Sequence, residues 1–311
     1  MLRQRLKKTT NQKINNMSIE TKFRAFQLDS PGSLFSYYKT NNYTLIEARL
    51  PKGGIEILRK DLNYHNKDRI DTLHVTSWDD DHCDWDSLTQ IMNQFRPNRI
   101  EIPGYEPKSE TGVACKELIM KYDIIHQKYI NNVTIYNQNT IRSLSNGKAW
   151  STNNIVYESL FDVDNSNDMS QIRLFRSSGF NVLSLGDCES KDIATNLMKY
   201  ATFIKNETDI IILPHHGSEN TMLTPEFLDF CKPILSVCSS NYDNEYSHPR
   251  QSVVNLLTNK NVKSLTTKMG DVVVIKEVNE DTNVYNYISN NNKLEGTYTF
   301  KTKRQLFQAK D

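Results

Sequence analysis

Clusters of Asp and His side chains occur at three separate places in this chain of 311 residues. The first lies in residues 76–84, which read Thr-Ser-Trp-Asp-Asp-Asp-His-Cys-Asp. The second is Asp187, after Leu-Gly, and the third is the pair His215 and His216, after Pro. Each cluster follows an apolar run, as residues at the end of a strand would. Carboxylates that lie close together raise the free energy of the folded state unless a cation pairs with them. The three clusters therefore predict one shared metal site.

In the first cluster, Asp79, Asp81 and His82 could point into one cavity. Alternate residues of an extended chain share a face, so Asp79 and Asp81 would project together and a turn would add His82. Carboxylate and imidazole ligands together suit zinc, manganese or iron, and an oxygen-rich set favours manganese or magnesium. The alternative for this segment is a solvated acidic loop.

The two later clusters add ligands from other parts of the chain. Asp187 is interpreted either as a ligand that bridges two ions or as the cap of the helix that follows it. His215 and His216 come after a buried strand, and Gly217 allows close approach of the backbone. We predict that His215 binds the metal, and that His216 or His248 stabilises or protonates the leaving group.

Alternating β and α patterns surround these clusters. Apolar runs separated by turns indicate a β-meander over residues 23–50, and residues 70–75 are predicted to be a strand that ends at the first cluster. Helices are predicted over residues 88–95, 116–125, 193–203, 225–230 and 249–257, the last opening on a proline. Residues 264–267 and 272–275 are predicted to form a closing hairpin. Two sheets sandwiched by helices follow from this order of elements.

The order and spacing of these motifs resemble the metallo-β-lactamase fold, and in particular the hydrolase domain of the DNA-uptake competence channel family (ComEC-like). That family runs Ser-His-Pro-Asp-x-Asp-His, Asn-x-x-Ser, Leu-x-Gly-Asp, Pro-His-His-Gly-Ser, His-Pro and a Thr…Gly hairpin. The corresponding segments here are residues 76–82, 167–170, 185–187, 214–218, 248–249 and 266–270. The resemblance covers roughly residues 20–277 and implies an α/β fold, a four-layer αββα sandwich.

Departures from the family pattern bear on the metal. Ser77 stands where the family has the first histidine of its metal motif, and Glu47 stands where it has an early aspartate. The resemblance implies a first metal position at Ser77, Asp79 and residues 167–168, which is weakened here. It implies a second position whose ligands are all present: Asp81, His82, Asp187 and His215. We therefore expect one tightly held divalent ion, Zn or Mn, with a second ion weakly held or absent, and Asp79 could act as a general base instead.

The ligand types and the resemblance together indicate a hydrolase that cleaves phosphodiester bonds, in nucleic acid or a nucleotide, with a metal-activated water. Nucleic acid is implied by the resemblance alone, since a fold does not fix a substrate. Two alternatives stay open. One is an ester, lactone or amide hydrolase on the same fold. The other, motivated by the missing first histidine, is a catalytically reduced module that acts through a protein partner.

Composition limits the class of protein. Five scattered cysteines without a Cys-x-x-Cys pair argue against a disulfide framework and a thiolate zinc site. No stretch approaches the roughly 20 apolar residues of a membrane helix, so we expect a cytoplasmic protein without membrane contact. The net charge of +1 gives no overall attraction to nucleic acid. The hydrolase domain is expected over residues 19–285, between a flexible basic arm (residues 1–18) and a basic extension (residues 286–311). The Lys and Arg side chains of these two tails either contact phosphates or are simply solvated.

Overall fold

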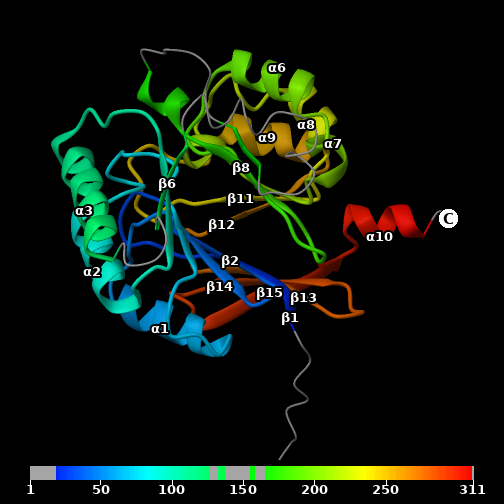
Figure 1. Cartoon of the computed structure of the whole chain (residues 1–311). Coiled ribbons are helices and arrows are strands. Elements are labelled where there is room, and N and C mark those ends of the chain that lie inside the picture. The colour runs from blue at the N-terminus through cyan, green and yellow to red at the C-terminus, as the bar shows by residue number, and fades with distance from the viewer. Residues whose placement is uncertain (1–18, 127–131, 137–154, 158–164, 310–311) are drawn as a thin grey trace, which may run out of the picture.

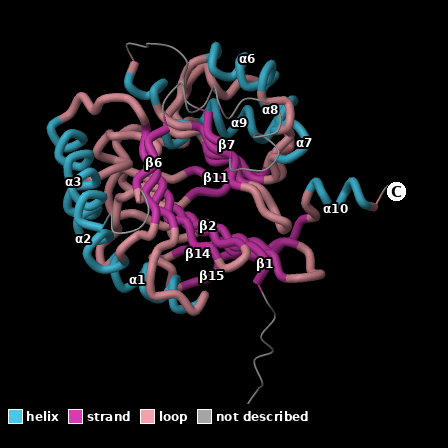
Figure 2. The backbone as a smooth tube through the Cα atoms, viewed as in Figure 1, coloured by secondary structure: helices cyan, strands magenta, loops and turns pink. Residues whose placement is uncertain are grey.

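The computed structural model describes residues 19–126, 132–136, 155–157 and 165–309. Two β-sheets pack face to face, and helices cover the outer side of each (Figures 1 and 2). The predicted four-layer αββα sandwich is confirmed. The expected basic arm at residues 1–18 lies outside the described residues.

The larger sheet has nine strands in the order β15-β14-β13-β1-β2-β3-β4-β5-β6. They are β1 (Ile19–Ala25), β2 (Phe35–Lys39), β3 (Asn42–Ile46), β4 (Thr72–His74), β5 (Arg99–Pro103), β6 (Val133–Tyr136), β13 (Val272–Glu277), β14 (Thr282–Ile288) and β15 (Lys293–Phe300). Strands from β15 to β3 pair antiparallel, whereas β3 to β6 pair in parallel. The parallel strands are joined by α1 (Gly54–Tyr64), α2 (Trp85–Phe95) and α3 (Glu110–His126), as parallel strands require crossover connections.

The smaller sheet has six strands in the order β12-β11-β10-β9-β8-β7. They are β7 (Ile155–Tyr157), β8 (Ile172–Phe175), β9 (Val182–Ser184), β10 (Ile210–Ile212), β11 (Leu235–Cys238) and β12 (Lys263–Thr266). Strands β9 to β12 are parallel, so their carboxyl ends lie at one edge. The helical segments of this half are η1 (Ser166–Met169), α6 (Lys191–Tyr200), α7 (Ile204–Glu207), η2 (Pro214–Gly217), α8 (Pro225–Cys231) and α9 (Gln251–Asn259).

Three apolar clusters separate the four layers. One lies between the larger sheet and α1, α2 and α3, a second between the smaller sheet and its helices, and the third between the two sheets. Strand β10 shows how both faces of a parallel strand become buried. Ile210 and Ile212 pack in the cluster between the sheets, while Ile211 packs against the helices.

The predicted closing hairpin is wrong. β12 pairs with β11 in the smaller sheet, and β13 pairs with β1 and β14 in the larger one. The chain crosses between the sheets at residues 267–271, and Val272 and Val274 then bury their side chains in the cluster between the sheets. The hairpin partner of β13 is β14.

One helix boundary and one helix differ from the sequence analysis. The helix predicted to open on Pro249 begins at Gln251, with Arg250 as its N-cap residue. Helix α1 was not predicted. The domain limit predicted at residue 285 falls inside β14, and the larger sheet continues through β15 to a last short helix, α10 (Lys303–Gln308). No helix among the described residues combines the length and apolar character that a membrane span requires.

Candidate metal centre

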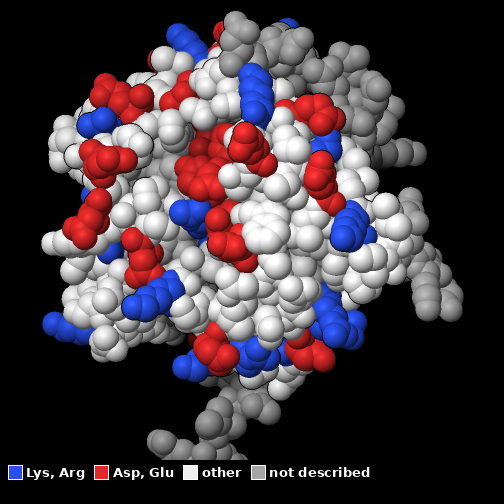
Figure 3. Space-filling view, turned by 90° about the vertical axis from the view of Figure 1, so that its left-hand side faces the viewer, with Lys and Arg blue, Asp and Glu red and all other residues white. Residues whose placement is uncertain are grey.

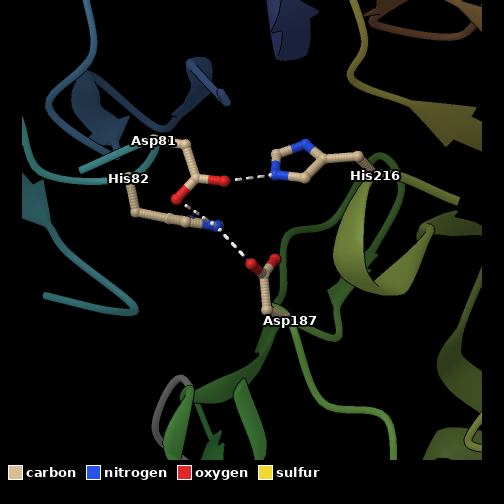
Figure 4. A group of neighbouring side chains, drawn as sticks. All are labelled: Asp81, His82, Asp187 and His216. Atoms are coloured by element: carbon tan, nitrogen blue, oxygen red, sulfur yellow. Dashed lines mark hydrogen bonds and ion pairs between the residues drawn. The ribbon is translucent and has the colours of Figure 1, made fainter. Parts of the chain in front are cut away.

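Four side chains from three loops meet where the two sheets converge. Asp81 and His82 follow β4, Asp187 follows β9, and His216 lies in η2 after β10. One potential ligand atom of each lies within 4.8 Å of the others (Figure 4). His216 Nε2 is 3.0 Å from Asp81 Oδ2, and His82 Nε2 is 2.9 Å from Asp187 Oδ2. Loops of both sheets thus supply two carboxylates and two imidazoles to one group.

The group contains three of the five predicted metal ligands: Asp81, His82 and Asp187. It contains His216, for which a catalytic role was predicted, where His215 was expected. The Nδ1 atom of His215 instead lies 2.7 Å from Glu189 Oε1. Both histidines have left-handed backbone conformations, with φ of 44° at His215 and 53° at His216. Neither strand nor helix periodicity applies there, so their directions do not follow from the sequence pattern.

Asp79 lies outside the group. The backbone N–H groups of His82 and Cys83 both donate to the carbonyl of Asp79, at 2.9 and 2.8 Å. This segment is therefore a turn, not the extended chain that was expected to place Asp79 and Asp81 on one face. The Asp79 carboxylate accepts a hydrogen bond of 3.0 Å from Ser77 Oγ, and burial raises its pKa.

An oxygen atom lies close to the Nδ1 atom of each imidazole. Glu47 Oε1 lies 3.2 Å from His82 Nδ1, and Glu47 in turn accepts hydrogen bonds from the backbone N–H and the hydroxyl of Thr76. His216 Nδ1 lies 3.1 Å from the carbonyl oxygen of Ser239. An acceptor at each Nδ1 favours the tautomer that carries its lone pair on Nε2, the arrangement typical of metal-binding histidines.

The charges of the group fit a divalent cation. Burial would lower the pKa of His82, but the carboxylates of Asp187, Asp81 and Glu47 raise it well above its ordinary value. Burial would likewise raise the pKa of Asp81, which His82 and His216 lower. His82 Nε2 is buried and has no well-aligned hydrogen-bond partner among the described residues. A cation ligated by these atoms would replace the protons that now balance the carboxylates.

A cavity of about 310 Å³ opens beside the group. It is lined by Pro31, Gly32, Asp81, His215, His216, Ser240, Asn241, Asn244, Tyr246 and His248. The ring centroids of His215 and His248 are 5.9 Å apart. Burial, together with the nearby His215 and His216, lowers the pKa of His248 to about 4, which keeps its imidazole neutral near pH 7. The predicted catalytic histidines therefore both lie at the cavity, together with His215.

Gly32 contacts both the loop that carries Asp81 and His82 and the loop that follows β11 in the smaller sheet. Its φ is 140°, and a Cβ atom there would lie 2.5 Å from the carbonyl oxygen of Asp81. The neighbouring Ser33 N–H donates to that oxygen at 2.9 Å, and Ser239 Oγ donates to the Gly32 carbonyl at 2.9 Å. Only glycine permits this contact without displacing Asp81.

The sequence analysis missed two residues that contact the histidines of the site, Glu189 and Ser239. Glu189 stands two residues after Asp187, and this spacing of carboxylates, like that of Asp79 and Asp81, is a signal that could have drawn attention to it. Ser239 contributes a backbone carbonyl, for which the sequence carries no signal.

Comparison with solved structures identifies the fold. The metallo-β-lactamase fold protein YhfI from Bacillus subtilis superposes with a TM-score of 0.50 and 9% sequence identity, over 82% of this chain and 99% of YhfI. The chain has the metallo-β-lactamase fold. A variant of CmlA beta-hydroxylase superposes with a TM-score of 0.51 and 13% identity, over 83% of this chain and 54% of that protein.

Sequence comparison finds partial similarity of this metallo-β-lactamase-fold chain to other proteins. No family model matches it. Competence protein ComA of Neisseria gonorrhoeae is 32% identical over 93 residues, which are 30% of this chain and 13% of ComA. ComE operon protein 3 of Bacillus subtilis is 23% identical over 216 residues, which are 66% of this chain and 24% of that protein. The similarity is thus confined to a minor part of each of these two relatives.

The surface gives little electrostatic attraction for a polyanion on the face shown in Figure 3. Asp and Glu side chains gather near the middle of that face, and Lys and Arg side chains stand singly around them. A continuous basic stripe, which is the usual footprint of non-specific nucleic-acid binding, is not seen there.

Proposed function

We propose that this chain is a metal-dependent phosphodiesterase whose substrate is a nucleic acid or a nucleotide. The observation that carries the proposal is the group of Asp81, His82, Asp187 and His216, with both imidazoles oriented by acceptors at Nδ1. The ComEC-like motifs of the sequence support a phosphodiester substrate. The similarities to Competence protein ComA and to ComE operon protein 3 agree with that resemblance.

The donor set suits one Zn or Mn ion. A divalent cation held there would supply a water nucleophile at neutral pH and polarise a phosphoryl oxygen. A second ion would need a ligand at Ser77, the position of the missing histidine. The hydroxyl of Ser77 is engaged by Asp79 and by Tyr105, each at 3.0 Å, which supports the proposal of a single ion.

His215 is the side chain best placed to move a proton. It lines the cavity, and Glu189 holds its Nδ1 at 2.7 Å, so Nε2 is the atom that can protonate a leaving oxygen. Burial would raise the pKa of Glu189, but hydrogen bonds from His215, Asn165 and Asn167 lower it, which keeps Glu189 ionised as the partner of the imidazole.

Elemental analysis combined with a substrate screen tests the proposal. Washed protein should retain about one divalent ion per chain and hydrolyse bis-nitrophenyl phosphate but not nitrophenyl acetate. Asp187→Asn should lower the metal content and reduce phosphodiester hydrolysis by at least about 100-fold. Asp192→Asn, the same change at an exposed position of α6, is the matched control and should alter neither.

The same measurements can overturn it. Hydrolysis of the acyl ester without the phosphodiester would point to an ester hydrolase on this fold. A protein that binds no ion and cleaves neither substrate would point to a module that acts through a partner.

A further inference from the structure

An exposed tyrosine forms part of the wall of the cavity beside the metal group, which consists of Asp81, His82, Asp187 and His216. Tyr246 is 52% exposed and lines the same cavity as Asp81 and His216. Its ring packs on that of His248, with centroids 5.7 Å apart and an interplanar angle of 29°. One face of the phenol ring is thus supported by the protein, while much of its surface stays open to solvent.

The loop that carries Tyr246 is held in place by the side chain of Asn244. The amide nitrogen of Asn244 donates to the carbonyls of Asn241 and His248, at 2.9 and 3.1 Å, and its oxygen accepts from the backbone N–H of His248 at 2.6 Å. The backbone N–H of Ser247 donates to the Asn244 carbonyl at 3.1 Å. These contacts fix the backbone on both sides of Tyr246, so its position is part of the folded structure.

The charges around this ring favour an uncharged, flat group. The residues that line the cavity include no Lys or Arg. The loop adds the carboxylates of Glu245, which directly precedes Tyr246, and of Asp243, three residues before it, and both would repel phosphate. A phosphodiester at the metal group would therefore place its charge at the cation and an uncharged part of the substrate against Tyr246.

We infer that Tyr246 stacks against the nucleobase that adjoins the phosphodiester held at the metal group. The inference rests on the proposed function, and it adds a contact to the base of the substrate to the binding of its phosphodiester. Aromatic side chains stack on bases of any sequence, because every base has a π-face. The subsite would thus select for the presence of a base and be tolerant of its identity.

Two dinucleotides test the inference, one with both bases and one abasic at both positions. The metal-loaded protein should cleave the base-bearing dinucleotide with the higher kcat/KM. Tyr246→Ala should lower kcat/KM for that substrate by about 10- to 100-fold and leave the abasic one unchanged. Tyr246→Phe should keep the preference for bases. Tyr200→Ala, which removes a tyrosine that is 60% exposed on α6, is the matched control and should change neither rate.

The outcomes separate this inference from the proposed function. If the wild type cleaves both dinucleotides equally, or if Tyr246→Ala slows both to the same extent, stacking is overturned while the phosphodiesterase proposal stands. If neither dinucleotide nor bis-nitrophenyl phosphate is cleaved, the proposed function itself fails.

Discussion

Glu47 illustrates how a buried residue outside the metal group can govern it. It is 2% exposed, has a left-handed φ of 70°, accepts hydrogen bonds from Thr76, and lies 3.2 Å from His82 Nδ1 as its ion-pair partner. In Glu47→Gln only one oxygen remains to accept, so either His82 or Thr76 loses its partner. We expect Zn or Mn affinity, measured by calorimetry, to fall about 10- to 100-fold.

The exposed Glu56 of α1 supplies the control for this experiment. Glu56→Gln makes the same chemical change at a side chain that is 70% exposed, and it should leave metal affinity unchanged. Equal metal affinities for Glu47→Gln and the wild type, with both proteins folded by circular dichroism, would show that Glu47 does not orient His82.

Residue types identified the Asp and His clusters, but they did not show which side chain of each cluster points into the site. Asp81, His82 and Asp187 were expected in one site because they follow strand ends, and the structure brings them together. The choice between His215 and His216 depended on two consecutive left-handed residues. Such a conformation has no side-chain period, so a pattern argument cannot settle it.

At the scale of elements, a buried carboxylate fastens α1 to the larger sheet. Asp61 accepts from Lys22 Nζ at 2.6 Å and Arg24 Nη1 at 3.0 Å on β1, and from the hydroxyls of Ser36 and Tyr43. Asp61→Asn would leave the buried Lys22 and the half-buried Arg24 less compensated. We expect the free energy of unfolding in urea to fall by about 3–5 kcal/mol.

A matched change on the surface tests whether burial is the cause. Asp68→Asn alters an exposed carboxylate between α1 and β4 and should change stability by less than about 0.5 kcal/mol. If Asp61→Asn lowers the free energy of unfolding by less than about 1 kcal/mol, the ion pairs and hydrogen bonds of Asp61 add little to the attachment of α1.

The contact between Gly32 and Asp81 predicts a second effect at the level of loops. In Gly32→Ala the new methyl group would overlap the carbonyl oxygen of Asp81, so the first ligand loop must shift. Metal affinity should fall by at least about 10-fold, measured by competition with a chelating dye. Gly296→Ala on β15, where nothing lies within 4 Å of the added Cβ, should bind metal like the wild type. Unchanged affinity in Gly32→Ala would show that the loop tolerates the shift.

Local patterns predicted most elements and failed where tertiary contacts decide. Apolar spacing marked α2, since Leu88, Ile91 and Phe95 all face the core. Helix α1 escaped notice because its buried apolar positions are few, Leu58 and Leu62 among them. The assignment of β12 and β13 to different sheets depends on their pairing with β11 and with β1, which a short-range pattern does not contain.

At the scale of the whole molecule, the metal group joins the two sheets. Asp81 and His82 come from the larger sheet, and Asp187 and His216 from the smaller one. The distances between these pairs depend on how the sheets pack, so sequence spacing could not supply them. The motif order could nevertheless be recognised, because the ligands lie in the loops that follow β4, β9 and β10.

Asp209 connects distant parts of the fold and predicts a pH dependence of stability. Its carboxylate accepts from the backbone N–H groups of Asn181, before β9, and Lys303, at the start of α10, at 2.9 and 2.8 Å. Burial outweighs these bonds and raises the pKa of Asp209 from 3.8 to about 6. Between pH 3.8 and about 6, the Asp209 carboxyl is therefore protonated to a greater extent in the folded state than in the unfolded state.

Stability contributed by protonated Asp209 should be complete below pH 3.8 and lost as the pH rises through about 6. The loss amounts to about 3 kcal/mol, from a shift of about two pKa units. Asp209→Asn cannot ionise, so the stability of the wild type relative to this variant, measured by urea unfolding at pH 4 and pH 7, should fall by most of that amount. A difference between the two proteins that stays constant from pH 4 to pH 7 would show that the buried carboxyl titrates alike in both states.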